Sequence, residues 1–185
     1  MTAKTDVRTI KTRRSLIIAL FALLERKPWA KVSIKDICKE AMVSRSTFYA
    51  HFEDKYALLE YTMKEMGEVV LRDLLETDMR TMLQKRFSQM KDNERIVKNM
   101  LLAEPEQDLL ALIYRHFQNV THRYLEEIGA SVEEDVVRIA VGFYGAGVGS
   151  TIVGWFVNGQ DIPVDTMVDL LCRVLEPAEQ IFKKE

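Results

Sequence analysis

The side chains with the clearest chemistry lie in a short polar stretch, VSRSTFYAHF, from Val43 to Phe52. It brings together three aliphatic hydroxyl groups, a phenol, an arginine and a histidine. All of these groups donate hydrogen bonds to anions, so the combination predicts contact with a polyanion. The candidate contact residues in this stretch are Ser44, Arg45, Ser46, Thr47, Tyr49 and His51.

Charge is divided unevenly along the chain. Residues 1–55 hold 12 Lys and Arg against 6 Asp and Glu, whereas residues 56–185 hold 14 against 22. A basic first third joined to an acidic remainder is typical of a small nucleic-acid-binding domain on a body that does not bind nucleic acid. Ordinary solvated surface charge is the alternative explanation of the same split.

The composition favours a folded cytoplasmic protein without catalytic chemistry. With 185 residues, 48% of them apolar, the chain can bury a substantial core. Cys38 and Cys172 form no CxxC pair, and the basic N-terminus lacks the apolar core of a secretion signal. A metal cluster of His116, His122 and Glu126 is rejected, because only the last two share a helix face. We also find no activated nucleophile, phosphate loop or acid/base pair, and therefore expect no metal, no cofactor and no enzyme.

Apolar spacing predicts helices throughout, and no segment shows the sustained alternation of a strand. The first helix ends before Pro28, which discourages its continuation. Ser33 and Asp36 predict a capping box that opens a second, short helix. After the three-residue turn MVS, Ser44 caps a third short helix, and Asp54 caps a longer fourth helix.

Two short helices joined by a three-residue turn are typical of a helix-turn-helix. Phe48 and Phe52 share a face near Val43, so we expect them to pack a small three-helix core. Any capped helical hairpin would give a similar pattern, and this remains the alternative. Ser33 and Ser44 place hydroxyls beside the N–H groups of a helix start, which suits contact with phosphate.

The segment SIKDICKEAMVSRSTFYAHFEDKYALL resembles the DNA-binding region of the TetR family of transcriptional regulators. In that family a helix-turn-helix is followed by an aromatic-rich TFYxHFxxK element. The resemblance is dense from Thr12 to Leu59 and implies that Tyr49 and Lys55 contact the DNA backbone, a role that suits a phenol and an ammonium group. Beyond Leu59 the helical character and the length agree, and the glycine-rich helix near Trp155 is weakly similar to the last helices of one branch.

Base recognition is then expected from the first turn and exposed face of the third helix. Arg45, Ser46 and Thr47 can reach base edges in the major groove, where a guanidinium matches guanine and a threonine methyl meets a thymine methyl. His51 has two open interpretations. It is either a phosphate donor or a helix-end residue packed beside Phe52.

The segment from Ile139 to Gln160 contains no charged residue and many glycines. Its length permits a membrane span, but the glycines weaken an isolated helix and the flanks lack basic anchors. We expect it instead to pack, with the last helix, on a second copy of the chain as a four-helix interface. The expected interface residues are Gly145, Gly149, Ile152, Val168, Leu171 and Leu175.

Methionine and aromatic side chains in the body predict a cavity for a small apolar or aromatic effector. Methionine adapts to irregular ligands, although such residues at helical spacing also form ordinary cores. No cluster of buried basic residues is visible that would hold an anion. The candidate lining residues are Met63, Met66, Val70, Met100, Ile113, Tyr114, Phe117 and Tyr144.

The sequence thus predicts an all-α protein with a three-helix helix-turn-helix head at residues 1–53 and a regulatory and dimerisation bundle at residues 54–185. We expect a homodimeric, ligand-responsive repressor that binds an inverted repeat in double-stranded DNA. Two alternatives stay open, a helical adaptor whose body binds a regulatory protein and a membrane-anchored helical protein. The sequence gives neither the operator nor the choice between repression and activation.

Overall fold

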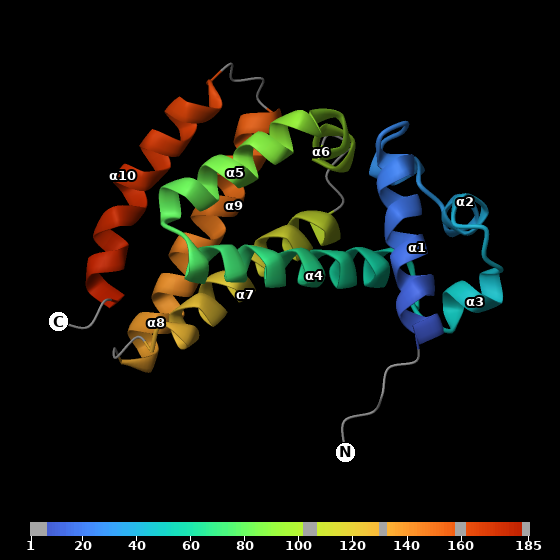
Figure 1. Cartoon of the computed structure of the whole chain (residues 1–185), viewed down its shortest axis with the longest axis horizontal. Helices are drawn as coiled ribbons and strands as arrows, with labels where there is room; N and C mark the ends of the chain where they lie inside the picture. The colour runs from blue at the N-terminus through green and yellow to red at the C-terminus, as the bar shows by residue number, and fades with distance from the viewer. Residues whose placement is uncertain (1–6, 102–106, 130–132, 158–161, 183–185) are drawn as a thin grey trace. The chain divides into compact units, whose positions relative to one another are not determined.

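Every regular element in the described part of the chain is helical, which confirms the all-α prediction (Figure 1). The computed structural model describes residues 7–101, 107–129, 133–157 and 162–182. By its internal contacts the chain divides into two compact units. Unit 1 comprises Met1–Met63 and Arg95–Glu106, and unit 2 comprises Lys64–Glu94 and Gln107–Glu185. The boundary therefore falls inside a helix, later than residue 53, and a segment from far along the chain joins the first unit.

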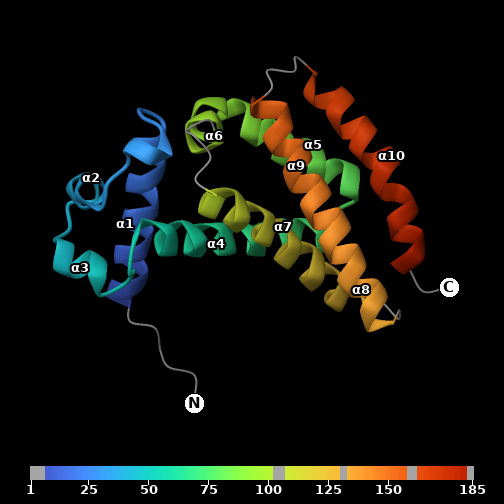
Figure 2. The same cartoon turned by 180° about the vertical axis from the view of Figure 1, so that it is seen from behind.

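Unit 1 is built around α1, against which α2 packs, with α3 packed on α2 in turn (Figures 1 and 2). Its largest fully buried side chains come from each of these helices and from the connection between α1 and α2, among them Leu20, Trp29, Ile37 and Phe48. The elements are α1 (Val7–Leu24), η1 (Trp29–Lys31), α2 (Ile34–Glu40), α3 (Arg45–Tyr49), the first part of α4 (Lys55–Glu76) and α6 (Glu94–Leu101) from Arg95 onward.

The helix starts predicted for this unit are confirmed. Ser33 and Asp36 form a reciprocal capping box at the start of α2. The Ser44 side chain accepts the N–H of Thr47 at the start of α3, and the Asp54 carboxylate accepts the N–H of Ala57 at 2.8 Å. These bonds satisfy N–H groups that have no partner within their helices, which is why local sequence specifies the helix starts well.

Unit 2 is a helical bundle in which α5 packs on α10, and α7 packs on both η2 and α9 (Figure 2). α4 approaches α7 at Gly67, where a Cβ would lie 3.2 Å from His116 Cε1. Burial lowers the pKa of His116 to about 4, so its ring is neutral at pH 7. The elements are the rest of α4, α5 (Met79–Asp92), α7 (Gln107–Glu127), α8 (Glu134–Ala140), the π-helical turn η2 (Val141–Gly145), α9 (Ala146–Val157) and α10 (Val164–Phe182).

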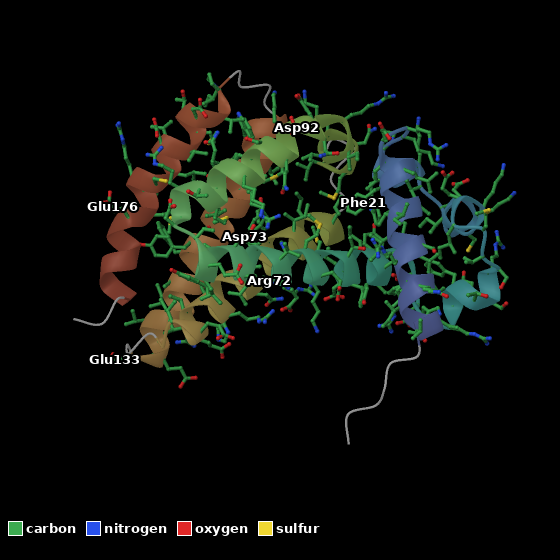
Figure 3. All side chains as sticks on the ribbon, viewed as in Figure 1. Phe21, Arg72, Asp73, Asp92, Glu133 and Glu176 are labelled. Atoms are coloured by element: carbon green, nitrogen blue, oxygen red, sulfur yellow. The ribbon has the colours of Figure 1, made fainter. Side chains whose placement is uncertain are left out.

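A buried carboxylate ties α4 to α5 within unit 2. Asp73, labelled on α4 in Figure 3, accepts hydrogen bonds from Lys85 at 3.1 Å and from Arg86. Burial opposes ionisation of Asp73, but the hydrogen bonds and charges of these two side chains outweigh it and lower its pKa. Asp73 is thus compensated by two cations of α5, which link α4 to α5 through side chains.

The turn between α2 and α3 contains backbone strain. Met42 has φ of 55°, in the left-handed region, and its side chain is 92% exposed. A side chain at such a φ brings Cβ close to the following carbonyl oxygen, and the exposed Met42 side chain gains little packing in return.

Met42→Gly should therefore raise the free energy of unfolding by about 1 kcal/mol, because glycine adopts this φ without the steric penalty. Urea unfolding of the full chain at a fixed protein concentration measures the change. Met42→Ala is the matched control, since it removes the same side chain but keeps Cβ and hence the strain. Equal effects of the two substitutions would show that the side chain, and not the backbone, limits stability at this turn.

Candidate nucleic-acid interface

α3 buries one side of its surface and exposes the other. The Phe48 ring is fully buried and lies 6.0 Å, centroid to centroid, from the buried Phe52 ring, which confirms the predicted aromatic core. Tyr49 is 57% exposed and stands edge-on to Phe48, with ring centroids 5.7 Å apart. Burial of Phe48 thus fixes which residues of this five-residue helix face solvent, and Arg45 and Ser46 are among them.

The hydroxyls at the start of α3 form one hydrogen-bonded cluster. Ser44 Oγ lies 2.8 Å from Ser46 Oγ and 2.8 Å from Thr47 Oγ1, and it accepts the Thr47 N–H at 3.0 Å. The two hydroxyl–hydroxyl bonds use two of the three hydroxyl protons, which leaves one to donate to a ligand or to water. The predicted contact residues Ser44, Arg45, Ser46 and Thr47 are therefore together at one helix end.

Ser33 at the start of α2 differs from Ser44, because a carboxylate of its own chain already lies beside it. Asp36 Oδ2 accepts hydrogen bonds from Ser33 Oγ at 2.6 Å and from Ser33 N at 3.1 Å, and Lys27 Nζ lies 2.7 Å from the same oxygen. Hydrogen bonds from Lys27 and Ser33 hold the pKa of the Asp36 carboxyl well below its usual range. Asp36 thus already accepts both donors of Ser33, and the phosphate contact predicted for Ser33 stays a prediction.

Lys55 has contacts inside unit 1. Its ammonium lies 4.5 Å from the centroid of the Trp29 ring and 3.3 Å from the Trp29 carbonyl oxygen. The edge of the Tyr56 ring meets Trp29 at a centroid distance of 5.3 Å. These contacts hold Lys55 at the junction of η1 and α4, so a DNA contact by Lys55 would use an ammonium whose position is already fixed.

His51 and Arg13 both lie beside the aromatic core. The His51 ring is 6.4 Å from the Phe52 ring, which favours the packing interpretation of this histidine. The Arg13 guanidinium stacks over Tyr61 at 4.9 Å and over Phe52 at 5.8 Å. Arg13 thereby ties α1 to α4, a role that helical periodicity does not reveal because the two helices meet only in the folded chain.

The residues predicted to line a cavity separate into different environments. Tyr114 and Phe117 cover Gly149, where a Cβ would lie 3.1 Å from Tyr114 Cδ1 and 2.9 Å from Phe117 Cδ2. Met66 is 51% exposed, so it does not line an enclosed space. Ile113 is buried in unit 2, Val70 is half-buried, Tyr144 packs on Leu125 and Ala140, and Met63 and Met100 belong to unit 1. In the described residues, no three His, Cys, Asp or Glu side chains are placed to hold a metal ion.

The glycines expected at a dimer interface are used inside the chain. A Cβ on Gly145 would lie 2.8 Å from Gln118 Cα, so this glycine permits close approach of η2 to α7. Gly149 serves the contact with Tyr114 and Phe117. Of the other expected interface residues, Ile152, Val168 and Leu171 are buried within the chain and Leu175 is half-buried. These residues pack within one chain, and their expected role in a dimer interface stays a prediction.

A different set of apolar side chains on the same helices faces solvent. Ile139 and Phe143 are 69% and 70% exposed, four residues apart. Gly142 and Gly147 lie on the same segment, and a Cβ on either would meet no atom within 4 Å. Further exposed apolar residues are Val136 on α8, Val157 on α9, and Leu170 and Val174 on α10. This set, called the exposed apolar face below, is what a partner would cover.

The stretch Glu134–Val157 is also long and apolar enough to cross a membrane, judged by length and composition alone. It has 24 residues and a mean hydropathy of 1.5 in its most apolar window, of which 22% is buried. A core helix of a soluble protein passes the same test, so this property is weak evidence for a membrane span.

Two family models match the chain. Residues 16–62 match the model described as "Bacterial regulatory proteins, tetR family", and residues 77–177 match a "Transcriptional regulator C-terminal region". The chain belongs to the TetR family. It is therefore a DNA-binding transcriptional regulator, and these matches support that function and not the helical adaptor.

Solved structures with the same fold cover almost the whole chain. The activator of a dihydroxyacetone kinase operon, DhaS, is 14% identical, with a TM-score of 0.65 over 95% of this chain and 99% of its own. The repressor AlkX of Dietzia sp. strain DQ12-45-1b is 20% identical, with a TM-score of 0.65 over 92% and 98%. A TetR regulator of Streptococcus agalactiae 2603V is 20% identical, with a TM-score of 0.60 over 95% and 96%. At these identities the likeness shows the fold.

A curated relative from Bacillus subtilis (strain 168), the HTH-type transcriptional regulator YxbF, is 36% identical over 50 residues. The match covers 27% of this chain and spans only 13% of the length of that relative. The similarity is therefore local, and the activity and partners of the whole relative do not transfer to this chain.

Gly145→Ala should lower the free energy of unfolding by roughly 1–3 kcal/mol, because its Cβ would overlap the main chain of α7, which cannot move aside as a side chain can. Gly147→Ala is the matched control on the same helical segment. It should cost less than Gly145→Ala, since a Cβ at Gly147 meets no atom of its own chain within 4 Å and adds helix propensity. Urea unfolding at one protein concentration compares the two. A neutral Gly145→Ala variant would contradict the close approach.

Proposed function

We propose that the chain is a homodimeric repressor that binds an inverted-repeat operator through α3 and releases it when an apolar or aromatic effector binds the body. The observation that carries the proposal is the two-sided α3, with Phe48 fully buried and Arg45, Ser46 and Tyr49 turned to solvent. A short helix anchored on one side and bearing donors on the other suits insertion into the major groove.

The donors on this helix divide into two kinds. Arg45 carries the fork that matches O6 and N7 of guanine, so we assign base recognition to it, with Ser46 and Thr47 beside it. Tyr49 and Lys55 are assigned to the DNA backbone, where a phenol and an ammonium position the head without reading sequence. The hydroxyl proton left over in the Ser44 cluster suits a phosphate oxygen equally well.

A second copy of the chain is the partner that the exposed apolar face requires. One head neutralises few phosphates, and affinity for DNA grows with the number neutralised. Two heads that meet successive major grooves, about 34–36 Å apart, double this number and select an inverted repeat. The exposed apolar face provides side chains that protrude, such as Phe143, and open positions at Gly142 and Gly147, as a self-complementary interface needs.

Repression needs only that the bound dimer block access to DNA, and this is the simplest consequence of operator binding. The names of the similar structures include both an activator and a repressor, so a promoter–reporter measurement with and without the protein tests the direction of control.

An effector that binds the DNA-competent and DNA-incompetent forms with different affinity, by about 1–3 kcal/mol, would shift operator affinity roughly 5- to 150-fold. A cytoplasmic location is part of the proposal, because the protein must reach DNA.

Arg45→Ala should reduce the preference for an operator duplex over a scrambled duplex by about 1–3 kcal/mol, because it removes a base contact. The operator is first selected from a pool of random duplexes by the wild-type protein, and affinities are measured at several salt concentrations. Arg95→Ala is the matched control, since Arg95 is an exposed arginine of unit 1 outside α3. If Arg45→Ala weakened both duplexes equally, Arg45 would contact only the backbone.

Phe143→Glu should convert the dimer to monomer and weaken operator binding, because it places like charges at the centre of a two-fold interface and removes buried apolar area. Sedimentation measures the assembly state. Leu75→Glu, at an exposed leucine of α4 outside the exposed apolar face, is the matched control and should remain dimeric. A dimeric Phe143→Glu variant with normal operator affinity would place the interface elsewhere.

A further inference from the structure

The C-terminal end of α1 contains a carbonyl that its own helix cannot satisfy. The carbonyl of Leu24 would normally accept the N–H of the residue four positions later, and that residue is Pro28, which has no N–H. Leu24 is fully buried, so water does not reach this end of the helix freely. A buried carbonyl without a donor costs free energy.

The missing donor comes from α6. Asn99 Nδ2 donates to the Leu24 carbonyl at 2.7 Å, across 75 positions of sequence. Both residues belong to unit 1, and Leu101 of the same short helix is buried. α6 is therefore part of the unit that carries the helix-turn-helix, and Asn99 supplies the hydrogen bond that Pro28 removes.

The end of α1 also holds α2 in place. Immediately after Leu24, Arg26 forms an ion pair with Glu40 at 2.6 Å, and Lys27 forms one with Asp36 at 2.7 Å. Glu40 ends α2 and Asp36 caps its start, so the segment after Leu24 contacts both ends of this helix. α2 in turn packs against α3. Contacts thus lead from Asn99 through the end of α1 and through α2 to the exposed donors of α3.

We propose that Asn99 is a positioning residue for operator recognition: by donating to the Leu24 carbonyl it fixes the end of α1 on which α2 is seated, and so the orientation of α3. The inference rests on the proposed role of α3 in reading the operator. Phosphate contacts tolerate small displacements of a helix, whereas bidentate base contacts do not. Loss of the Asn99 amide therefore weakens specific binding more than non-specific binding.

The test uses the full-length protein, a duplex that the wild type selects from random sequences, and a scrambled duplex. Asn99→Asp keeps the shape of the side chain, removes the donor and sets a carboxylate against the Leu24 carbonyl. Asn93→Asp is the matched control, because Asn93 Nδ2 also donates to a main-chain carbonyl, that of Gln89, at 2.8 Å, but within its own helix end. Binding is measured well below the melting temperature of each variant, so that every protein is folded.

Asn99→Asp should bind the selected duplex roughly 2- to 12-fold more weakly, the range expected for one hydrogen bond, with little change on the scrambled duplex. Asn93→Asp should match the wild type on both, and Asn99→Gln, which keeps an amide donor, should recover part of the loss. If Asn99→Asp does not fold, Asn99→Ala replaces it, with the same expectation.

Two outcomes would overturn the inference. The first is that the folded variant without the Asn99 donor prefers the selected duplex as strongly as the wild type does. The second is that this variant loses the same affinity for the selected and the scrambled duplex. A wild-type protein that selects no duplex would instead overturn the proposed operator, whatever the Asn99 variants do. The two failures are therefore distinguishable.

Discussion

The position of α3, the proposed recognition helix, depends on one buried side chain. A five-residue helix contains too few internal hydrogen bonds to be stable alone, because nucleation costs more than so short a helix returns. Phe48 therefore has to anchor α3 against the rest of unit 1, and its burial decides that Arg45, Ser46 and Tyr49 face outward. The aromatic contacts around it, from Phe52 to Tyr61 and Arg13, give the anchor a fixed orientation. One side of α3 therefore packs in the core, and the opposite side exposes the hydrogen-bond donors.

The charged groups of unit 1 follow the same division between structure and recognition. Asp36 is neutralised locally by Lys27 and by the cap of its own helix, and Glu40 is paired with Arg26. Acidic side chains that would repel DNA are therefore compensated by bonds that hold α2 on α1. The start of α3, by contrast, has only hydroxyls and a guanidinium. These two ion pairs use two acidic and two basic side chains, so they leave the basic excess of residues 1–55 unchanged.

Local chemistry explains which features the sequence predicted correctly. Ser33, Ser44 and Asp54 each cap a helix through atoms within three residues, so their roles follow from the sequence alone. The partner of Asn99 could not be predicted, because nothing local relates it to Leu24, although the proline four residues after Leu24 does indicate that a donor is needed.

The glycine-rich segment shows that a composition pattern does not reveal which contact each glycine serves. Its glycines are of two kinds that sequence does not separate: Gly145 and Gly149 allow α7 to approach, whereas Gly142 and Gly147 have open space where a Cβ would be. Gly142 and Gly145 both lie in the π-helical turn Val141–Gly145, and Gly147 and Gly149 both lie in α9. The inward glycines meet Gln118, Tyr114 and Phe117, while Phe143 is turned outward. The uncharged segment thus has one apolar side that packs against its own chain and a second that is exposed to solvent. An exposed apolar surface of this kind is the feature on which the proposed dimer rests.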